Sequence, residues 1–138
     1  MASSGDVAYV SDPTASPVAR LALYAFLGDG YTTTALAPAG RELSDLTEVR
    51  PTKIVASAAV FAEAVRAGLA GVEERSGSNG GWVRRASRLA PLARARRDRR
   101  AIREILGGRA RRIGSIDPLD SALAERLGGI AVVGTAPI

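Results

Sequence analysis

A chain of 138 residues, 46% of them hydrophobic, is long enough to bury the core of one domain without a disulfide or a metal. It contains no cysteine and no histidine, which excludes thiol nucleophiles, zinc sites built on these side chains and histidine general bases. The net charge of +5 is uneven, because the twelve arginines and two acidic residues between Arg84 and Arg112 give that segment +10 and leave −5 for the remainder.

Apolar runs and helical patterns alternate along the whole chain, separated by glycine and proline. In the first half of the chain we predict a strand at Val7–Ser11, a helix from Pro17 to "GDG", a strand at Tyr31–Ala37, a short helix in "RELSDLTEV", a strand in "TKIVAS" and a helix in "AAVFAEAVRAGLAGVEE". A linker at residues 76–81 then leads into a basic helical insert at residues 82–106, which Pro91 kinks or splits. The chain continues with a strand at Arg109–Ser115, a helix at Leu119–Leu127 and a last strand in "GIAVVGTAPI".

This alternation is typical of a parallel sheet whose crossover helices cover both faces. We therefore predict that residues 1–138 form a single α/β domain, a three-layer sandwich with about five mostly parallel strands. Within it, Lys53–Ser57 should be a central strand and Ala58–Glu73 its crossover helix.

The chain has no pattern that directs it to a membrane. The amino-terminal sequence "MASSGDVAYVSDP" lacks the basic region and apolar run of a signal peptide. The longest apolar stretch, Val18–Gly28, is too short to span a bilayer and contains Arg20. We expect a soluble cytoplasmic protein without a transmembrane segment.

Several segments resemble one enzyme family. The stretch "DLTEVRPTKIVASAAVFAEAVRAGL" resembles the part of long-chain fatty-acyl-CoA synthetases, in the AMP-binding, adenylate-forming ligase superfamily, where a helix ending in "EVRPT" leads into a strand and a second helix. Downstream, "RRAIREILGGRARRIGSIDPLDSALAERLGGIAVV" is similar to the family's segment around "LGGR", and upstream "VARLALYAFLGDGYTTTALAP" is similar to an earlier helix and strand. The resemblance implies an internal segment of the sheet-and-helix core of the ligase amino-terminal domain.

The same resemblance implies that the ligase machinery is missing. The family's phosphate loop should lie before Val7, its "YG-x-TE" motif after Val133, and its adenylation lysine in a further domain, a role that Lys53 cannot take from inside a strand. The family's "VPR" turn has become Ser57-Ala58-Ala59. We therefore expect a non-catalytic or degenerate relative, a pseudoenzyme of fatty acid metabolism that serves as an interaction or scaffold module.

The family's adenine-contacting "GGAP" corresponds to residues 115–118, of which only Pro118 matches. Ser115, Asp117 and Pro118 are therefore the candidate remnant of an adenylate pocket, which would hold ATP, AMP or CoA only if family binding survives. This leaves open a weak nucleotide-binding or acyl-CoA-binding protein, or a subunit of a split ligase. No catalytic residue and no metal ligand is assigned. Asp117, like Asp120, is also typical of a helix cap, and Ser57 of an N-cap.

The arginine-rich segment is the remaining candidate site. It could grip the phosphates of nucleic acid, an anionic lipid surface or an acidic partner. It is also typical of a solvated basic face, and only Trp82 lies near it for base stacking. The partners we expect are a protein or a second copy at an exposed sheet edge, with nucleic acid as a weaker alternative. The anion-binding candidates are Arg94, Arg96, Arg97, Arg99 and Arg100.

Overall fold

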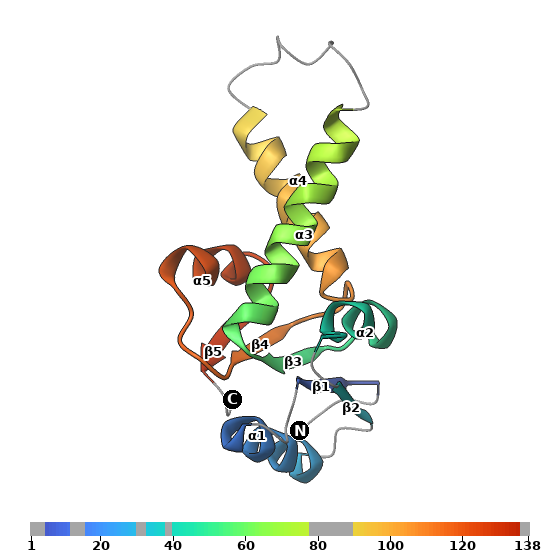
Figure 1. Cartoon of the computed structure of the whole chain (residues 1–138), viewed down its shortest axis with the longest axis vertical. Coiled ribbons are helices and arrows are strands. Elements are labelled where there is room, and N and C mark those ends of the chain that lie inside the picture. The colour runs from blue at the N-terminus through green and yellow to red at the C-terminus, as the bar shows by residue number, and fades with distance from the viewer. Residues whose placement is uncertain (1–4, 12–15, 30–32, 38–39, 78–89, 136–138) are drawn as a thin grey trace.

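The computed structural model of the protein describes residues 5–11, 16–29, 33–37, 40–77 and 90–135. These residues form one five-stranded sheet in the order β2-β1-β3-β4-β5, and every neighbouring pair of strands is parallel (Figure 1). The elements are β1 (Val7–Ser11), α1 (Pro17–Gly28), β2 (Thr33–Ala37), α2 (Glu42–Val49), β3 (Lys53–Ala56), α3 (Ala58–Gly77), α4 (Ala90–Ile105), β4 (Arg112–Ser115), α5 (Ser121–Gly128) and β5 (Val132–Thr135).

Strand β3 is central, because it lies between β1 and β4. All four of its residues are buried, and Ile54 pairs with Tyr9 on one side and Ile113 on the other. Helix α3 follows directly and carries the chain across the sheet. The predicted central strand and its crossover helix are therefore confirmed. A parallel strand covered on both faces requires a continuous apolar run, which is the pattern that indicated it.

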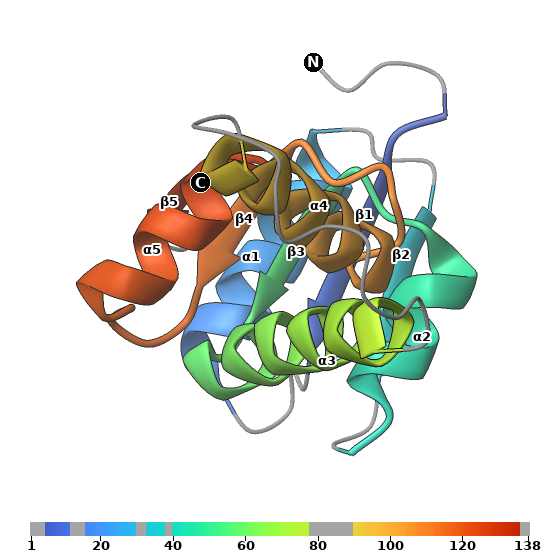
Figure 2. The ribbon, with the colours of Figure 1, turned by 90° about the horizontal axis from the view of Figure 1, so that it is seen from above.

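The sheet separates two apolar cores and gives the predicted three-layer sandwich. Tyr9 and Ile54 pack with residues of α2, α3, α4 and α5 on one face. The alternate positions Val10 and Val55 pack with Phe26 of α1 on the other. The layers are unequal, because α1 is the one described helix on its face (Figures 1 and 2).

Helices α3 and α4 form a hairpin that projects away from the sheet (Figure 1). The two backbones meet closely at Gly68, where a Cβ would lie 3.0 Å from the Cα of Ile102. Farther out, every residue of α4 from Pro91 to Arg97 is exposed, and we call residues 91–97 the α4 arm. The length of the hairpin therefore leaves the first two turns of α4 without a core to pack on.

Strand β4 begins at Arg112, so the predicted start at Arg109 is wrong. Gly107 and Gly108 have φ of +87° and +78°, and their amides bond back to the last turn of α4. The residues after Gly108 lead away from this turn before the strand can begin. Pairing starts only where the amides of Arg111 and Arg112 donate to the carbonyl of Thr52, at 2.8 and 3.3 Å.

The boundaries around the linker also differ from the prediction. Helix α3 continues through Gly77, so the linker does not begin at Ser76. Residues 78–89 lie outside the described part, and so does the segment on the far side of the kink predicted at Pro91. In the described helix, Pro91 occupies the first turn of α4, where its missing N–H is tolerated.

Two of the segments that resemble the ligase family, "EVRPT" and "LGGR", contact each other. Arg50 ends α2 in a left-handed conformation with φ of 52°, and its Nε donates to the carbonyl of Gly107 at 3.3 Å. A Cβ at Gly107 would collide with the carbonyl oxygen of Leu46 and lie 2.8 Å from the Cα of Arg50. Only glycine fits that position with a positive φ. Both pieces therefore close the ends of α2 and α4 against each other, which is a structural role.

Candidate functional site

The candidate adenylate-pocket residues lie at the carboxyl end of β4. Ser115 is the last residue of the strand and is 2% exposed, and its Oγ has no hydrogen-bond partner within the described residues. Asp117 and Pro118 are exposed in the turn that follows. The structure thus separates one buried hydroxyl from two exposed residues, and neither cavity described below is lined by any of the three.

The capping interpretations have different outcomes. Asp120 is the N-cap of α5, and its Oδ1 accepts a hydrogen bond from the amide of Leu123 at 2.7 Å, which confirms that interpretation. For Asp117 the described residues supply no capping bond. Ser57 precedes α3, and its carbonyl accepts from the amide of Phe61 at 3.4 Å, but its hydroxyl makes no capping bond to a described residue.

The topology places the ligand crevice of an open α/β sheet one strand away from Ser115. Strand β1 leads into α1 on one face and β3 leads into α3 on the other, so the switch point lies between β1 and β3 at their carboxyl ends. Ser11 ends β1 there and donates from its Oγ to Oε1 of Glu42 at 3.4 Å. Oε2 of Glu42 accepts from the amide of Gly40 at 2.7 Å. The sequence did not predict a role for Glu42, because an acidic residue is common in the first turn of a helix.

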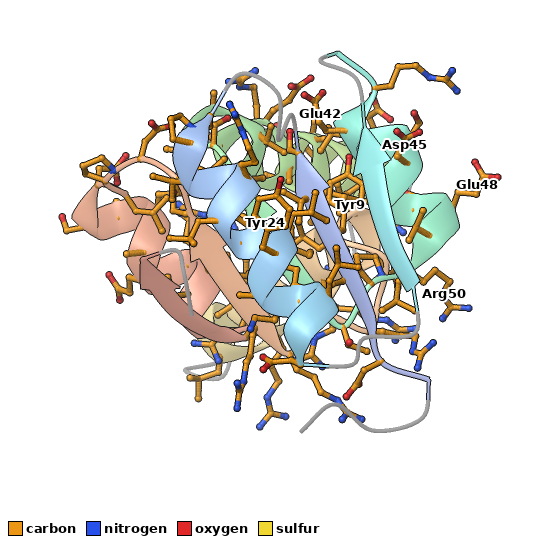
Figure 3. The ribbon with its side chains drawn as sticks, turned by 90° about the horizontal axis from the view of Figure 1, so that it is seen from below. Tyr9, Tyr24, Glu42, Asp45, Glu48 and Arg50 are labelled. Carbon is orange, nitrogen blue, oxygen red and sulfur yellow. The ribbon has the colours of Figure 1, made fainter. Side chains whose placement is uncertain are left out.

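Tyr9 of β1 carries a second buried hydroxyl, on the face of the sheet that α2 covers. Its side chain is fully buried, and its OH has no hydrogen-bond partner among the described residues. Burial raises the pKa of Tyr9 above its ordinary value, and the carboxylates of Asp45 and Glu42 on α2 add to that effect (Figure 3). The phenol therefore stays protonated and neutral over the physiological range.

Lys53 lies on the opposite face and at the opposite end of the strands. It is the first residue of β3 and is 2% exposed, with its ammonium 4.5 Å from the ring centroid of Phe26 in α1. Burial lowers the pKa of Lys53, Arg112 lowers it further and Asp29 opposes the change. Its place in the strand is the one predicted, far from the carboxyl edge where Ser115 lies.

The five arginines predicted to bind anions are all exposed on α4. Arg100 pairs with Glu104 one turn later at 3.2 Å, a surface pair worth about 0.3–0.5 kcal/mol. Arg99 lies against the end of α5, where its Nε would be 2.8 Å from a Cβ on Gly129. Arg94, Arg96 and Arg97 have no ion-pair partner in the described part of the chain.

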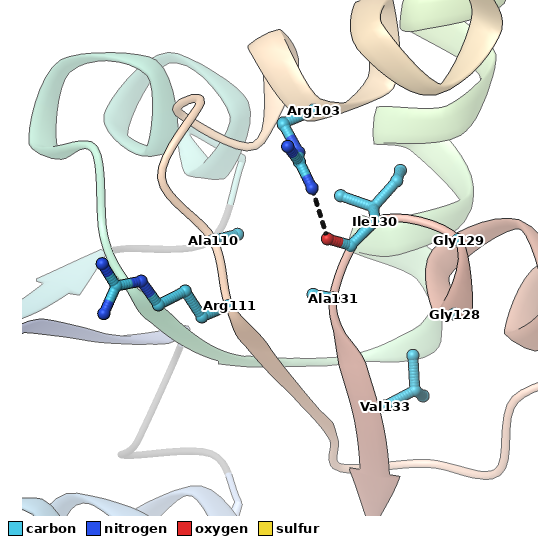
Figure 4. Close-up of a pocket in the computed structure, with 8 residues that line it drawn as sticks. All are labelled: Arg103, Ala110, Arg111, Gly128, Gly129, Ile130, Ala131 and Val133. Carbon is cyan, nitrogen blue, oxygen red and sulfur yellow. Dashed lines mark hydrogen bonds between the residues drawn. The ribbon is translucent and has the colours of Figure 1, made fainter. Parts of the chain in front are cut away.

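An open depression of about 600 Å³ lies at the amino ends of β4 and β5 (Figure 4). Arg103 and Arg111 both line it, with the guanidinium of Arg111 directed away from Arg103 (Figure 4), and residues Gly128 to Ala131 form much of its wall. Nη2 of Arg103 donates to the carbonyl of Ile130 at 2.8 Å, beyond the carboxyl end of α5. Sequence reasoning missed this depression, because its two arginines come from separate elements. A smaller groove of about 310 Å³ lies between α4 and α5, lined by Asp98, Arg99 and Glu125 among others.

The outer surface of α1 carries three large apolar side chains. Leu21, Tyr24 and Leu27 are 54%, 63% and 58% exposed and recur every third residue, so they share one face of the helix. Tyr24 points outward from α1 in the view of the side chains (Figure 3). The described residues contribute nothing that covers this stripe, which we call the α1 stripe.

Comparison with protein-family models, curated proteins and solved structures finds nothing that matches the chain. The relation to fatty-acyl-CoA synthetases therefore stays a prediction from the sequence. Within the described residues, no group of three or more acidic side chains is arranged to hold a metal ion. Among the described helices, none is both long and apolar enough to cross a bilayer.

Proposed function

We propose that this protein is a non-catalytic interaction module, a degenerate relative of the AMP-binding core of long-chain fatty-acyl-CoA ligases, which associates through the α1 stripe. The observation that carries the proposal is the exposure of Leu21, Tyr24 and Leu27 on one helix face. Large apolar side chains grouped on an exposed surface mark protein contacts more often than isolated ones do. Residues 57–59 and 115–118 depart from the family's "VPR" and "GGAP" motifs, as expected of a relative that retains the sheet and its surfaces but not the chemistry.

The occupant that fits this stripe is a second copy of the chain. Helix α1 carries one charged residue, Arg20, between Pro17 and Gly28, so two stripes can meet without like charges in contact. Six of the twelve arginines between Arg84 and Arg112 lie on α4, on the other face of the sheet. An antiparallel pairing of two α1 helices would give a closed twofold dimer, in which each stripe covers the other.

Sedimentation velocity over a wide range of protein concentration tests this proposal. We expect the wild-type chain to move from monomer to dimer as its concentration rises, with weak affinity because the stripe is small. The double variant Leu21→Gln/Leu27→Gln should stay monomeric, since glutamine keeps the helix but removes the apolar contact.

Leu92 provides the matched control, because it is 62% exposed on the α4 arm, away from α1. The variant Leu92→Gln should dimerise as the wild type does. A wild-type chain that stays monomeric at every concentration, or equal loss of dimer in both variants, contradicts the proposal. The absence of ligase activity is checked separately by fatty-acid-dependent ATP–pyrophosphate exchange, which the chain alone should not catalyse.

A second candidate function is weak binding of a nucleotide or acyl-CoA at the carboxyl edge of the sheet. The observation that favours it is the buried Oγ of Ser115, which has no partner among the described residues and lies at the carboxyl edge of the sheet, one strand away from the switch point. Calorimetric titration with ATP, AMP and an acyl-CoA tests it. Binding that Ser115→Ala weakens and Tyr9→Phe leaves unchanged would support it, and no heat at millimolar ligand would remove it.

A further inference from the structure

The α4 arm presents positive charge that the fold does not use. Arg94, Arg96 and Arg97 are exposed, have no ion-pair partner among the described residues, and pack on no core. By contrast, Arg50 bonds Gly107 and Arg103 bonds Ile130, so these two guanidinium groups already serve the fold. Exposed arginines such as Arg41 and Arg66 lie singly on the described surface, whereas the arm carries three within residues 94–97.

The positive surface continues from the arm toward the sheet. On a helix, residues three or four apart lie on one face, so Arg96, Arg99, Arg100 and Arg103 form a row along α4. The row ends at the depression that Arg103 lines together with Arg111 (Figure 4). Its acidic neighbours are Asp98, Glu104 and Glu125, of which Glu104 alone forms an ion pair among the described residues, with Arg100.

We propose that the arginines of this row and of the α4 arm, with the depression at the end of the row, form a binding surface for the phosphodiester backbone of duplex nucleic acid. A row of guanidinium groups on one helix matches an array of phosphates, because each guanidinium can donate two parallel hydrogen bonds to one phosphate. The arm projects from the body of the protein (Figure 1), and a projecting helix has the width that a major groove admits.

Two other polyanions fit the surface less well. Insertion into a membrane surface requires an apolar face, and Leu92 is the one large exposed apolar side chain among the described residues of α4. Single-stranded nucleic acid is held by aromatic side chains stacked on bases, and the described part of α4 contains no aromatic residue. Phosphate contacts without base readout predict binding that depends on salt and hardly on sequence.

Fluorescence anisotropy with duplex DNA oligonucleotides of unrelated sequence tests the proposal. We expect similar affinity for each sequence and a steep loss of affinity as salt rises, with a logarithmic slope of about −4 for four to five phosphates. The variant Arg96→Gln/Arg97→Gln should bind roughly tenfold more weakly and show a slope smaller in magnitude by about 2.

The matched control is Arg41→Gln/Arg66→Gln, which removes the same charge from exposed positions on or beside α2 and α3. Glutamine and arginine have similar helix propensity, and circular dichroism verifies that both variants fold. The control should bind DNA as the wild type does. Equal weakening in both variants would reduce the effect to net charge and overturn the proposal.

Two competitors complete the test. Phosphatidylserine vesicles or polyglutamate that bind the wild type more tightly than duplex DNA would overturn the proposal in favour of a lipid surface or an acidic protein. If the wild type does not bind duplex DNA even at low salt, the proposal is also overturned. None of these outcomes bears on dimerisation through the α1 stripe, which lies on the other face of the sheet.

Discussion

At the scale of single residues, two buried hydroxyls stand out because neither has a described partner. Ser115 Oγ and the OH of Tyr9 are both enclosed. A buried polar atom that makes no hydrogen bond costs about 1–3 kcal/mol, so it is retained where it has a use or where loss of packing would cost more. For Ser115, the position at the carboxyl end of a strand favours a role in ligand binding. Tyr9 lies deeper, under α2, and there the aromatic ring supplies the packing.

Replacing Tyr9 by phenylalanine should raise the free energy of unfolding by about 1 kcal/mol at neutral pH, because the ring stays and the unpaired hydroxyl goes. The difference should widen in alkali. The raised pKa keeps Tyr9 protonated in the folded chain, whereas the unfolded chain ionises near the ordinary value of 10.0, so wild-type stability falls as pH rises above that value.

Urea unfolding at pH 7 and at about pH 11 measures both effects. Tyr24→Phe is the control, since that side chain is 63% exposed and its removal should change neither value appreciably. Equal stability of the wild type and Tyr9→Phe at both pH values would show that the hydroxyl is satisfied by a group such as ordered water.

At the scale of elements, the crossing of α3 and α4 decides how the basic helix is held. Gly68 permits the two backbones to approach, and Ile102 fills the space beside it. The projecting geometry follows, because α3 has twenty residues while the strands it crosses have four or five. A helix of that length extends past the sheet and takes the start of α4 with it.

Gly68→Ala should destabilise the protein by about 1–3 kcal/mol, since its methyl group would press on the Ile102 backbone and force the helices apart. Gly71→Ala, one turn later, should instead stabilise it by up to about 1 kcal/mol. Its Cβ would meet only the mobile end of Arg75 at 3.6 Å, and alanine favours the helix. Thermal unfolding of the two variants separates these outcomes, and equal effects of the same sign would contradict the close crossing.

At the scale of the whole molecule, the sheet places the two proposed surfaces on opposite faces. The α1 stripe is uncharged and apolar, whereas the α4 row is basic and polar. Hydrophobic association and phosphate binding respond oppositely to salt, since screening weakens only the second.

Leu21→Gln/Leu27→Gln should therefore remove the dimer and leave the DNA affinity of the monomer within about twofold of the wild type. Arg96→Gln/Arg97→Gln should do the reverse. Both are checked by sedimentation and anisotropy on the same preparations at low and high salt. Loss of both properties in either variant would mean that the surfaces are coupled or that the variant is misfolded.

The sequence by itself determined the order and type of the elements, because periodic apolar runs and glycine or proline breaks are local features. "KIVA" could be placed as a central strand, since an apolar run in an alternating α/β pattern is typical of a strand covered on both faces. The positive charge of α4 could also be predicted directly from the sequence.

Tertiary structure alone decided which residues meet. It paired Arg50 with Gly107, left the hydroxyls of Ser115 and Tyr9 without described partners, and separated Ser115 from Asp117 and Pro118. It also made Arg103 and Arg111 line one depression, and left α1 as the one described helix on its face of the sheet. These are contacts between residues distant in the chain. They depend on strand order and crossover handedness, which no local pattern encodes.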